Sequence, residues 1–455
     1  MDLQRLIEPR SIAVVGVSLS NPFHPANVIY NKNHLRAGAK TYAVNPHGGE
    51  LYGESVYPSL KEVPAAVDAV VVAVRADHVP GVVRDGIEAE AGGAIVISGG
   101  FKEVGRENLQ EEVRGLSQDH DFPLIGPNCL GVFSPPHMDT FFLPPERLLT
   151  PRAGEVALVS QSGGILVDLM IKLTQEGAGI SRGVSIGNKA VLDEVDLVAF
   201  LEADRATRVI GLYLEGFSPG RGRTFLDLLG RIEKPVVFFK AGRSPGGSRA
   251  VQSHTASMAG DYRVFREVLI QAGAMEARDE AEFVSFCEVL CSRSAPRVKR
   301  VGVVTASGGH GAVATDLCHD AGLELPRIPD TDQAVLRDRL SPSVKDIAST
   351  NNPVDLTGSA GDGDFYASTR FFLEREDVDA VILLCLPYIP GITSDVGARV
   401  AQLGREFGKP VVTYIPHIDK YGIFIDGFES NGVPVAHSVE GAVHMARALS
   451  WRAET

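Results

Sequence analysis

The sequence has little cysteine and no long apolar run. Its 455 residues include five cysteines, at positions 129, 287, 291, 318 and 385, too few and too scattered for a disulfide scaffold. Cys287 and Cys291 fit one apolar helix face, and no second Cys/His pair stands at the spacing that a zinc site needs. No apolar run reaches the roughly 18 residues of a membrane-spanning helix, and the N-terminus carries Asp2, Arg5 and Glu8 where a leader would be apolar. These absences favour a cytoplasmic protein with reduced thiols and no bound metal.

The chain also lacks an excess of positive charge. Lys and Arg number 44 and Asp and Glu 57, which gives a formal net charge of −13. Nucleic acids and anionic membranes attract basic proteins, so this balance argues against both as partners. Hydrophobic residues make up 44% and charged residues 22%, which is typical of a folded globular chain, and the length corresponds to about three domains.

Continuous apolar runs, each followed by room for one helix, recur along the whole chain. They lie at residues 11–18, 41–44, 69–74, 93–97 and 123–126, then at 156–160, 183–186, 209–214 and 235–240, then at 300–305, 378–384 and 410–415. Such runs are typical of parallel strands that helices cover on both faces. A proline-rich stretch at 134–154 and a second break at 292–297 divide the runs into three groups. We therefore predict an α/β protein of three doubly wound units in series.

Two of the predicted strand-to-helix turns share a sequence. Ser162-Gly163-Gly164 and Ser307-Gly308-Gly309 follow apolar strands at an offset of 145 residues. Glycines let a backbone approach an oxyanion closely, and the N–H groups and dipole at a helix start attract negative charge. The serines alone would also serve as ordinary helix caps. Because the turn occurs twice, we favour anion binding over plain capping.

The first predicted turn, Gly16-Val17-Ser18, resembles a nucleotide loop but lacks the G-x-G-x-x-G pattern. After the second strand, where an acidic residue would bind a ribose hydroxyl, the chain has Asn45-Pro46-His47. NAD binding is therefore disfavoured. A different adenine nucleotide remains possible, and so does a scaffold without a ligand.

His254 is the candidate nucleophile. It stands among small hydroxylated residues, after a glycine-rich loop at 241–248 that follows the strand at 235–240. A neutral imidazole attacks phosphoryl groups when a carboxylate holds its other ring nitrogen, and Glu215, at the end of the strand at 209–214, is the candidate carboxylate. Ligands gather at the carboxyl ends of parallel strands, so we expect Glu215, His254 and residues 162–164 to converge. The alternative is an ordinary surface or core histidine.

Five segments in order carry a resemblance to a known family. They are Gly126-Pro127-Asn128-Cys129-Leu130-Gly131, Ser160-Gln161-Ser162-Gly163-Gly164, Ser185-Ile186-Gly187-Asn188, Ser253-His254-Thr255-Ala256-Ser257 and Asn352-Pro353-Val354-Asp355-Leu356. Over essentially its whole length the chain resembles the α subunits of ADP-forming acetyl-CoA synthetases, in the NDP-forming acyl-CoA synthetase superfamily that includes succinyl-CoA synthetase. The resemblance implies a Rossmann-like CoA-binding domain at 1–133 and a flavodoxin-like, succinyl-CoA-ligase-like domain with the phosphohistidine loop at 154–292. A third, flavodoxin-like ligase domain is implied at 298–455.

The same resemblance implies roles for individual residues. His254 is expected to be phosphorylated and Glu215 to orient it, while residues 162–164 and then residues 307–309 bind the phosphoryl group. CoA contacts are implied at Gly16, Ser18, Ser20, Asn45, Pro46, Val74, Ser98 and Asn128. His47 stands where some relatives carry a lysine, and the resemblance assigns it no contact with a CoA phosphate.

The implied reaction is acyl-CoA + Pi + ADP ⇌ carboxylate + CoA + ATP, through an acyl phosphate and a phosphohistidine. No segment resembling an ATP-grasp domain follows the third unit, so we expect a separate ATP-grasp β subunit that supplies the ADP/ATP and Mg²⁺ sites, in an α₂β₂ heterotetramer. Acetate is the usual acid in the family, although relatives also activate branched and aromatic acids. Two alternatives are an acyl-CoA-sensing regulator and the synthetase-like part of a CoA-dependent lysine acetyltransferase.

Overall fold

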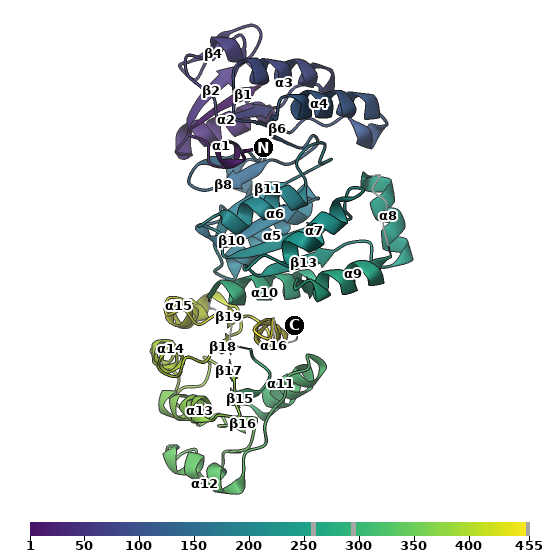
Figure 1. Ribbon diagram of the computed structural model, residues 1–455. Coiled ribbons are helices and arrows are strands. Elements are labelled where there is room, and N and C mark those ends of the chain that lie inside the picture. Colours follow the sequence, from purple (N-terminus) through teal and green to yellow (C-terminus); the bar gives the residue numbers. More distant parts are fainter. Residues whose placement is uncertain (256–260, 293–296, 452–455) are drawn as a thin grey trace. The chain divides into compact units, whose positions relative to one another are not determined.

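The computed structural model describes residues 1–255, 261–292 and 297–451. The chain divides into two compact units, residues 1–276 and 277–455. The described residues form three mainly parallel sheets (Figure 1). The predicted α/β class with three doubly wound sheets is confirmed.

The first sheet has the strand order β3-β4-β2-β1-β5-β6-β7. Its strands are β1 (Ser11–Val15), β2 (Lys40–Val44), β3 (Gly49–Leu51), β4 (Glu54–Tyr57), β5 (Ala69–Val72), β6 (Ala94–Val96) and β7 (Leu124–Ile125). The five predicted runs form β1, β2, β5, β6 and β7, and their pairings are parallel. The antiparallel β3–β4 pair was not predicted, because its exposed edge position requires no apolar run.

Successive side chains of the first sheet enter two different cores. Val14 and Val71 pack with α1 (Gln4–Ile7) and α2 (Pro25–Arg36) on one face. Val15 and Val72 pack on the other face with α3 (Val79–Glu88) and α4 (Glu107–Asp119). Three short 3₁₀ helices complete this part: η1 (Leu60–Glu62), η2 (Ala76–His78) and η3 (Lys102–Val104). Strands buried on both faces explain why the runs are apolar without alternation.

The second sheet has the order β14-β13-β12-β10-β11-β8-β9. Its strands are β8 (Val132–Ser134), β9 (Met138–Asp139), β10 (Ala153–Ser160), β11 (Ile180–Ser185), β12 (Val209–Leu214), β13 (Val236–Lys240) and β14 (Met275–Ala277), and η4 (Pro145–Arg147) lies between β9 and β10. β8 pairs antiparallel with β11. The proline-rich segment that the sequence presents as a linker therefore contains part of a strand pair.

Five helices accompany the second sheet. They are α5 (Gly163–Gln175), α6 (Glu194–Ala203), α7 (Arg221–Leu229), α8 (Pro245–Thr255) and α9 (Tyr262–Gln271). Val198 of α6 and Phe225 of α7 belong to the same buried cluster as Leu212 of β12. This cluster also contains the core between the first sheet and α2, so the first two sheets share one continuous core.

The predicted loop at 241–248 is shorter in the structure, because α8 begins at Pro245. Proline is well suited to the first turn of a helix, where its missing N–H costs no hydrogen bond. The Ser244 hydroxyl accepts the N–H of Gly247 at 3.1 Å, and its carbonyl accepts the N–H of Ser248 at 2.8 Å. These bonds stabilise the first turn of α8, so that Gly246, Gly247 and Ser248 are helical. Residues 241–244 therefore form the connection between β13 and α8.

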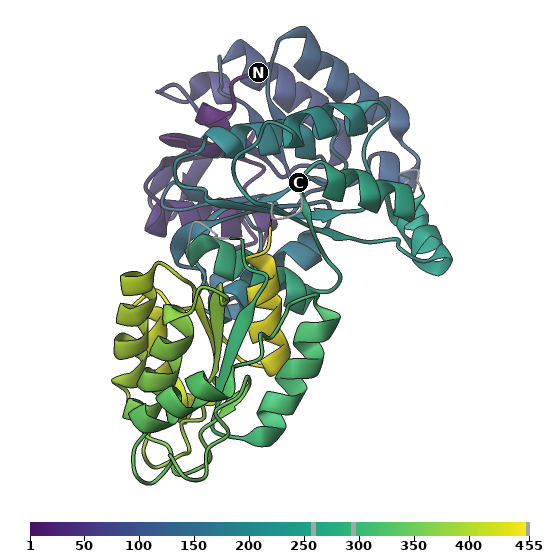
Figure 2. The same ribbon diagram turned by 60° about the horizontal axis from the view of Figure 1, so that its bottom comes forward.

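The third sheet, in the second unit, is parallel throughout, with the order β16-β15-β17-β18-β19. Its strands are β15 (Val301–Thr305), β16 (Val354–Asp355), β17 (Ala380–Leu384), β18 (Val411–Tyr414) and β19 (Val435–Ala436). Its helices are α10 (Glu280–Ser292), α11 (Gly308–Asp320), α12 (Asp330–Arg339), α13 (Asp362–Glu374), α14 (Val396–Phe407), α15 (Gly422–Glu429) and α16 (Val439–Ala448), with η5 (Asp419–Tyr421) before α15. Figure 2 shows α16, in yellow, and α11 on one face of this sheet and α13 to α15 on the other.

Helix α10 packs against α16 within the second unit. The buried Glu282 carboxylate accepts a hydrogen bond from Arg447 at 3.1 Å and one from Arg278 at 2.6 Å. Cys287 of the same helix is fully buried, and burial raises the pKa of its thiol. Within the described parts of the chain, no helix combines the length and the apolar character needed to cross a bilayer.

Candidate active site

The turn after β10 opens helix α5 at the carboxyl edge of the second sheet. The Ser162 hydroxyl caps α5 by accepting the N–H of Ile165 at 3.4 Å, and the Ser162 N–H donates to the Ser160 hydroxyl at 3.1 Å. Gly164 is exposed, and a Cβ atom added there would meet no atom within 4 Å. The first turn of the helix is therefore accessible to solvent, and anion binding there stays a prediction.

Gly163 is needed for a different reason, which is close packing. A Cβ atom at Gly163 would lie 2.9 Å from the Cβ of Leu130. The Leu130 N–H donates to the Ser185 hydroxyl at 3.1 Å, which fixes that loop to the end of β11. The start of α5 thus rests directly on the loop between β7 and β8.

Gln161 joins this turn to Glu215. The Gln161 Oε1 accepts the backbone N–H of Glu215 at 2.5 Å and that of Gly216 at 3.1 Å, while Nε2 donates to the Gly216 carbonyl at 2.8 Å. Gln161 and Glu215 are 6% and 4% exposed. The structure therefore brings Glu215 and residues 162–164 together. Gln161 was part of a quoted motif, but its role in holding Glu215 was not predicted.

A buried ion pair extends this network to α6. Gln161 Nε2 also lies 3.2 Å from Glu194 Oε2, and the Lys189 ammonium lies 3.1 Å from both carboxylate oxygens of Glu194. Burial raises the pKa of Glu194, while the charge of Lys189 opposes that rise. Lys189 also donates to the Gly216 carbonyl at 2.7 Å. The side chains of Gln161 and Lys189 thus both bind the backbone of residues 215–216.

Lys240 holds the same segment from the other side. Its ammonium donates to the Glu215 carbonyl at 2.8 Å and to the Ala241 carbonyl, and it lies 5.1 Å from the ring centre of Phe265. Burial lowers its pKa from 10.5 to about 8, and the negative charge of Glu215 opposes the shift. A cation in this position keeps the end of β12 and the end of β13 together.

We expect the stability of the protein to rise between pH 7 and pH 10 because of Lys240. The pKa of Lys240 is about 8 in the folded protein and 10.5 in the unfolded chain, so the unfolded chain binds this proton more tightly. Below pH 8 the buried charge therefore lowers the free energy of unfolding, and this destabilisation is lost as the pH rises from 8 to 10.5. In urea unfolding, the wild-type protein should gain roughly 2 kcal/mol relative to Lys240→Met over this interval. Lys345→Met, which removes an exposed lysine, should follow the wild-type profile. Parallel profiles for Lys240→Met and wild type would contradict the assignment.

His254 lies in the last turn of α8, but its side chain falls outside the described residues. Its convergence with Glu215 and the Ser-Gly-Gly turn stays a prediction. The connection between β13 and α8 contains Gly242, whose φ of +78° lies in the region that favours glycine.

A pocket of about 760 Å³ opens at the carboxyl edge of the first sheet. Five of the eight positions where CoA contacts are predicted are among its lining residues: Gly16, Asn45, Pro46, Val74 and Ser98. Three other predicted contacts, Ser18, Ser20 and Asn128, are not among them. His24, Arg75 and His78 also line the pocket and were not predicted, because a lone basic residue in a loop carries no pattern.

Local hydrogen bonds shape this pocket. The Asn45 side chain donates to the Val17 carbonyl at 2.7 Å, and the Ser98 hydroxyl accepts the N–H of Val74 at 3.1 Å. Ser18 has an internal role: its N–H donates to the Asn27 side chain at 2.7 Å, and its hydroxyl accepts the N–H of Ser20 at 3.4 Å. Ser18 therefore stabilises the loop after β1.

Asn128 lies where two loops meet. Its backbone has a φ of +56°, its N–H donates to the Ser98 carbonyl at 2.9 Å, and its side chain lies 3.4 Å from the Asn188 side chain. Asn188 in turn donates to Glu103 at 2.5 Å. Burial raises the pKa of Glu103, but hydrogen bonds from Asn188 and backbone N–H groups outweigh it, so the net pKa is lowered. Asn128 thus links Ser98 of the pocket to the loop that supports Gly163.

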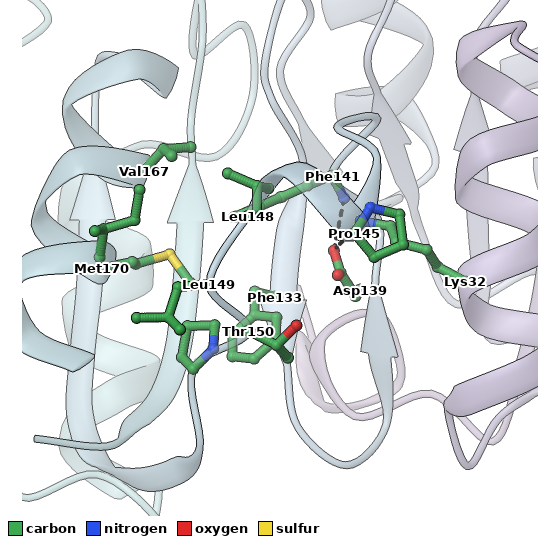
Figure 3. Close-up of a pocket in the computed structure, with 12 residues that line it drawn as sticks. Lys32, Phe133, Asp139, Phe141, Pro145, Leu148, Leu149, Thr150, Val167 and Met170 are labelled. Carbon is green, nitrogen blue, oxygen red and sulfur yellow. Dashed lines mark hydrogen bonds and ion pairs between the residues drawn. The ribbon is translucent and has the colours of Figure 1, made fainter. Parts of the chain in front are cut away.

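A second, small cavity lies beside the segment that follows β8 (Figure 3). Its volume of about 30 Å³ holds one or two water molecules, which excludes an organic substrate. The buried Lys32 of α2 forms an ion pair with Asp139 at 2.8 Å, and Asn33 exchanges two hydrogen bonds with the Asp139 backbone. These contacts fix the segment to α2, so that Phe142 can line the larger pocket.

The Ser-Gly-Gly turn at residues 307–309 differs from the turn at 162–164 in the hydrogen bonds that its serine makes. Ser307 makes no side-chain cap, and its hydroxyl lies 3.0 Å from Nδ1 of His310, whose ring stacks on Tyr414 with 5.8 Å between centres. The Ser307 N–H donates to the Thr305 hydroxyl at 3.1 Å, as the Ser162 N–H does to Ser160. Gly308 lies close to Asp355, and Gly309 is open to solvent. Both turns therefore begin 13-residue helices, the first with one exposed glycine, Gly164, and the second with two, Gly308 and Gly309.

Comparisons with known proteins agree with this arrangement. Residues 10–135 match the CoA binding domain, residues 153–290 the succinyl-CoA ligase like flavodoxin domain, and residues 301–418 the ligase-CoA domain. An acetate–CoA ligase [ADP-forming] II subunit alpha of Pyrococcus furiosus is 30% identical over 470 residues, which cover 99% of this chain and 98% of that protein. The chain belongs to the family of ADP-forming acetate–CoA ligase alpha subunits. The predicted family and the predicted ligase class are confirmed.

Other members of the family extend the comparison. A solved structure of Ca. Korarchaeum cryptofilum dinucleotide forming acetyl-coenzyme A synthetase 1, in complex with phosphate and ADP, superposes with a TM-score of 0.89 at 34% identity, covering 100% of this chain and 97% of that one. A 4-hydroxybutyrate–CoA ligase [ADP-forming] of Nitrosopumilus maritimus is 28% identical and matches 98% of this chain, which spans only 63% of that protein. Family members thus occur both as separate alpha subunits and as longer chains.

Proposed function

We propose that this chain is the α subunit of an acyl-CoA synthetase that converts acyl-CoA, phosphate and ADP into carboxylate, CoA and ATP through phosphorylated His254. One observation carries the proposal: a single loop connects the pocket of the first sheet to the Ser-Gly-Gly turn. Asn128 of that loop binds the Ser98 carbonyl at 2.9 Å, and Leu130 packs on Gly163. A thioester leaving the pocket would therefore reach phosphate bound at the turn.

The first step forms an acyl phosphate. A phosphate oxygen attacks the thioester carbonyl carbon, the carbon–sulfur bond breaks, and the CoA thiolate takes up the proton that the phosphate loses. Ser162, Gly163 and Gly164 hold the phosphate through N–H groups at the start of α5. A mobile acyl phosphate would hydrolyse in water, which is a reason for a closed site next to the CoA pocket.

The second step moves the phosphoryl group to His254. A ring nitrogen attacks phosphorus, the bond to the acyl oxygen breaks, and the carboxylate leaves. Glu215 accepts a hydrogen bond from the other ring N–H and stabilises the positive charge that develops there. Gln161, Lys189 and Lys240 position Glu215 by holding its backbone and that of Gly216.

The third step makes ATP. We propose that α8 moves about residues 241–244, so that Ser307, Gly308 and Gly309 hold the phosphoryl group in its second position. A terminal oxygen of ADP then attacks phosphorus, the phosphorus–nitrogen bond breaks, and His254 returns to its neutral form. ADP/ATP and Mg²⁺ are assigned to a separate ATP-grasp β subunit in an α₂β₂ assembly, and the support for a partner is that the Pyrococcus furiosus relative is itself named a subunit alpha.

Acetate is the first acid to test, because the Pyrococcus furiosus relative is named an acetate–CoA ligase. CoA is assigned to the pocket of the first sheet, with Gly16, Asn45, Pro46, Val74 and Ser98 as its wall. Ser18, Ser20 and Asn128 act through the loops that border the pocket. The cytoplasm, where acyl-CoA and ADP occur, is the proposed location.

The test is reconstitution of the full reaction. The full chain is combined with an ATP-grasp partner, Mg²⁺, ADP, phosphate and acetyl-CoA, and both ATP and free thiol are measured. We expect equal amounts of ATP and CoA, and no product when phosphate or the partner is omitted. Binding of acetyl-CoA without formation of either product would instead support an acyl-CoA-sensing protein and contradict the proposal.

A further inference from the structure

The pocket of the first sheet is lined by a guanidinium and two imidazoles although the chain as a whole is acidic. His24, Arg75 and His78 line it, and among the residues described around it Asp85 alone is acidic. The Asp85 carboxylate lies 3.6 Å from the Lys61 ammonium, which also pairs with Glu88 at 2.5 Å. Arg75 is thus the one charged group of positive sign among the residues described around the pocket, and a guanidinium there favours a ligand that carries negative charge.

The basic residues occupy two different walls. His24 caps helix α2, which follows β1, and its Nδ1 accepts the N–H of Ala26 at 3.3 Å. In doubly wound nucleotide-binding sheets, the diphosphate of the ligand lies at the start of the helix after the first strand. By this rule we expect the start of α2, where His24 lies, to face the diphosphate of a bound nucleotide. Arg75 and His78 lie on the wall formed by η2 and α3, after β5, and remain available for another anionic group.

Position 47 does not supply that charge. His47 is exposed and is absent from the lining residues, and its backbone N–H donates to the Asn45 side chain at 2.9 Å. Arg75 is exposed at the rim of the pocket, and the nearby Asp77 is held by Arg106. A guanidinium presents paired N–H donors that match phosphate oxygens better than a single ammonium or imidazole. Arg75 thus provides the cation that the sequence lacks at position 47.

We propose that Arg75 binds the 3′-phosphate of CoA and makes this chain select CoA over dephospho-CoA. This inference rests on the proposed function, because it assumes that the pocket holds CoA. The two ligands differ in the 3′-phosphate alone, so they separate this contact from contacts with the diphosphate. His78, three residues further along, lies on the same wall and adds polar character beside the guanidinium.

The experiment is calorimetric titration of the full chain with CoA and with dephospho-CoA. Arg75→Gln should weaken CoA binding about tenfold, the lower range for a charge-assisted hydrogen bond at an exposed site, and should change dephospho-CoA binding less than about twofold. Wild-type affinity of Arg75→Gln for CoA would overturn the proposal. Equal losses for both ligands would also overturn it, because they would place Arg75 at the diphosphate or show an indirect effect.

Arg84→Gln is the matched control. Arg84→Gln also removes one positive charge, here from α3. The Arg84 guanidinium pairs with Glu112 at 2.9 Å and does not line the pocket. We expect it to bind both ligands as the wild type does, and circular dichroism melting should show that both variants fold. If the wild-type chain binds neither ligand, the proposed function fails. If it binds CoA and Arg75→Gln binds equally well, this inference alone fails.

Discussion

Replacing His254 by alanine is expected to abolish acid-labile, base-stable labelling of the chain by γ-³²P-labelled ATP, and to lower turnover at least about a thousandfold. The reason is that no other group then accepts the phosphoryl group from the acyl phosphate. The label is measured after incubation with the ATP-grasp partner and Mg²⁺. Turnover is measured as ATP formed from acetyl-CoA, ADP and phosphate.

His120→Ala is the control for this experiment. His120 is exposed at the end of α4, where its Nδ1 lies 3.0 Å from the Leu116 carbonyl. This variant should be labelled and should turn over like the wild type. Labelling of His254→Ala at the wild-type level would show that the phosphoryl group resides on another residue, and an unlabelled wild-type chain would contradict the relay.

Replacing Gly16 by alanine is expected to lower the free energy of unfolding by about 3 kcal/mol and to weaken CoA binding at least about a hundredfold. Gly16 has a φ of +101°, and a Cβ atom there would lie 2.5 Å from the carbonyl oxygen of Ala73. That oxygen belongs to the backbone after β5, so β1 and β5 must separate to admit the methyl group. The pocket is lined by both Gly16 and Ala73 and would change shape. Urea unfolding and calorimetric titration measure the two effects.

Gly115→Ala is the matched control for Gly16→Ala. Gly115 lies inside helix α4, and a Cβ atom there would meet nothing within 4 Å. Alanine should therefore stabilise the protein by about 0.5–1 kcal/mol and leave CoA binding unchanged. Unaltered unfolding and CoA affinity in Gly16→Ala would show that the close approach of β1 to the residues after β5 is unnecessary.

The strands of the three sheets could be predicted where both of their faces are buried. The run at 209–214 is β12 with the same bounds, and the run at 69–74 contains β5. The short pairs β3–β4 and β8–β9 could not be predicted in this way. They lie at sheet edges, where pairing depends on a neighbouring strand rather than on a local apolar run.

The sequence predicts which residues begin the two helices of the candidate site, but it does not predict the contacts of their side chains. Both Ser-Gly-Gly turns begin helices, as their composition indicates. Only the structure shows that Ser162 caps its helix while Ser307 contacts His310. The difference follows from the third residue of each helix, Ile165 or His310, because an imidazole can contact the serine hydroxyl and an isoleucine side chain cannot.

The sequence by itself determined the α/β class, the family and the two helix starts at the Ser-Gly-Gly turns, because these depend on apolar runs, glycine spacing and short motifs that lie within a few neighbouring residues. The tertiary structure decided which side chains support the site. Gln161 binds the backbone of Glu215, Lys189 pairs with Glu194 beside it, and Arg75 lines the same pocket as Gly16. Except for the Lys189–Glu194 pair, these contacts join residues that are far apart along the chain, so folding places them together where no periodicity or spacing in the sequence could show it.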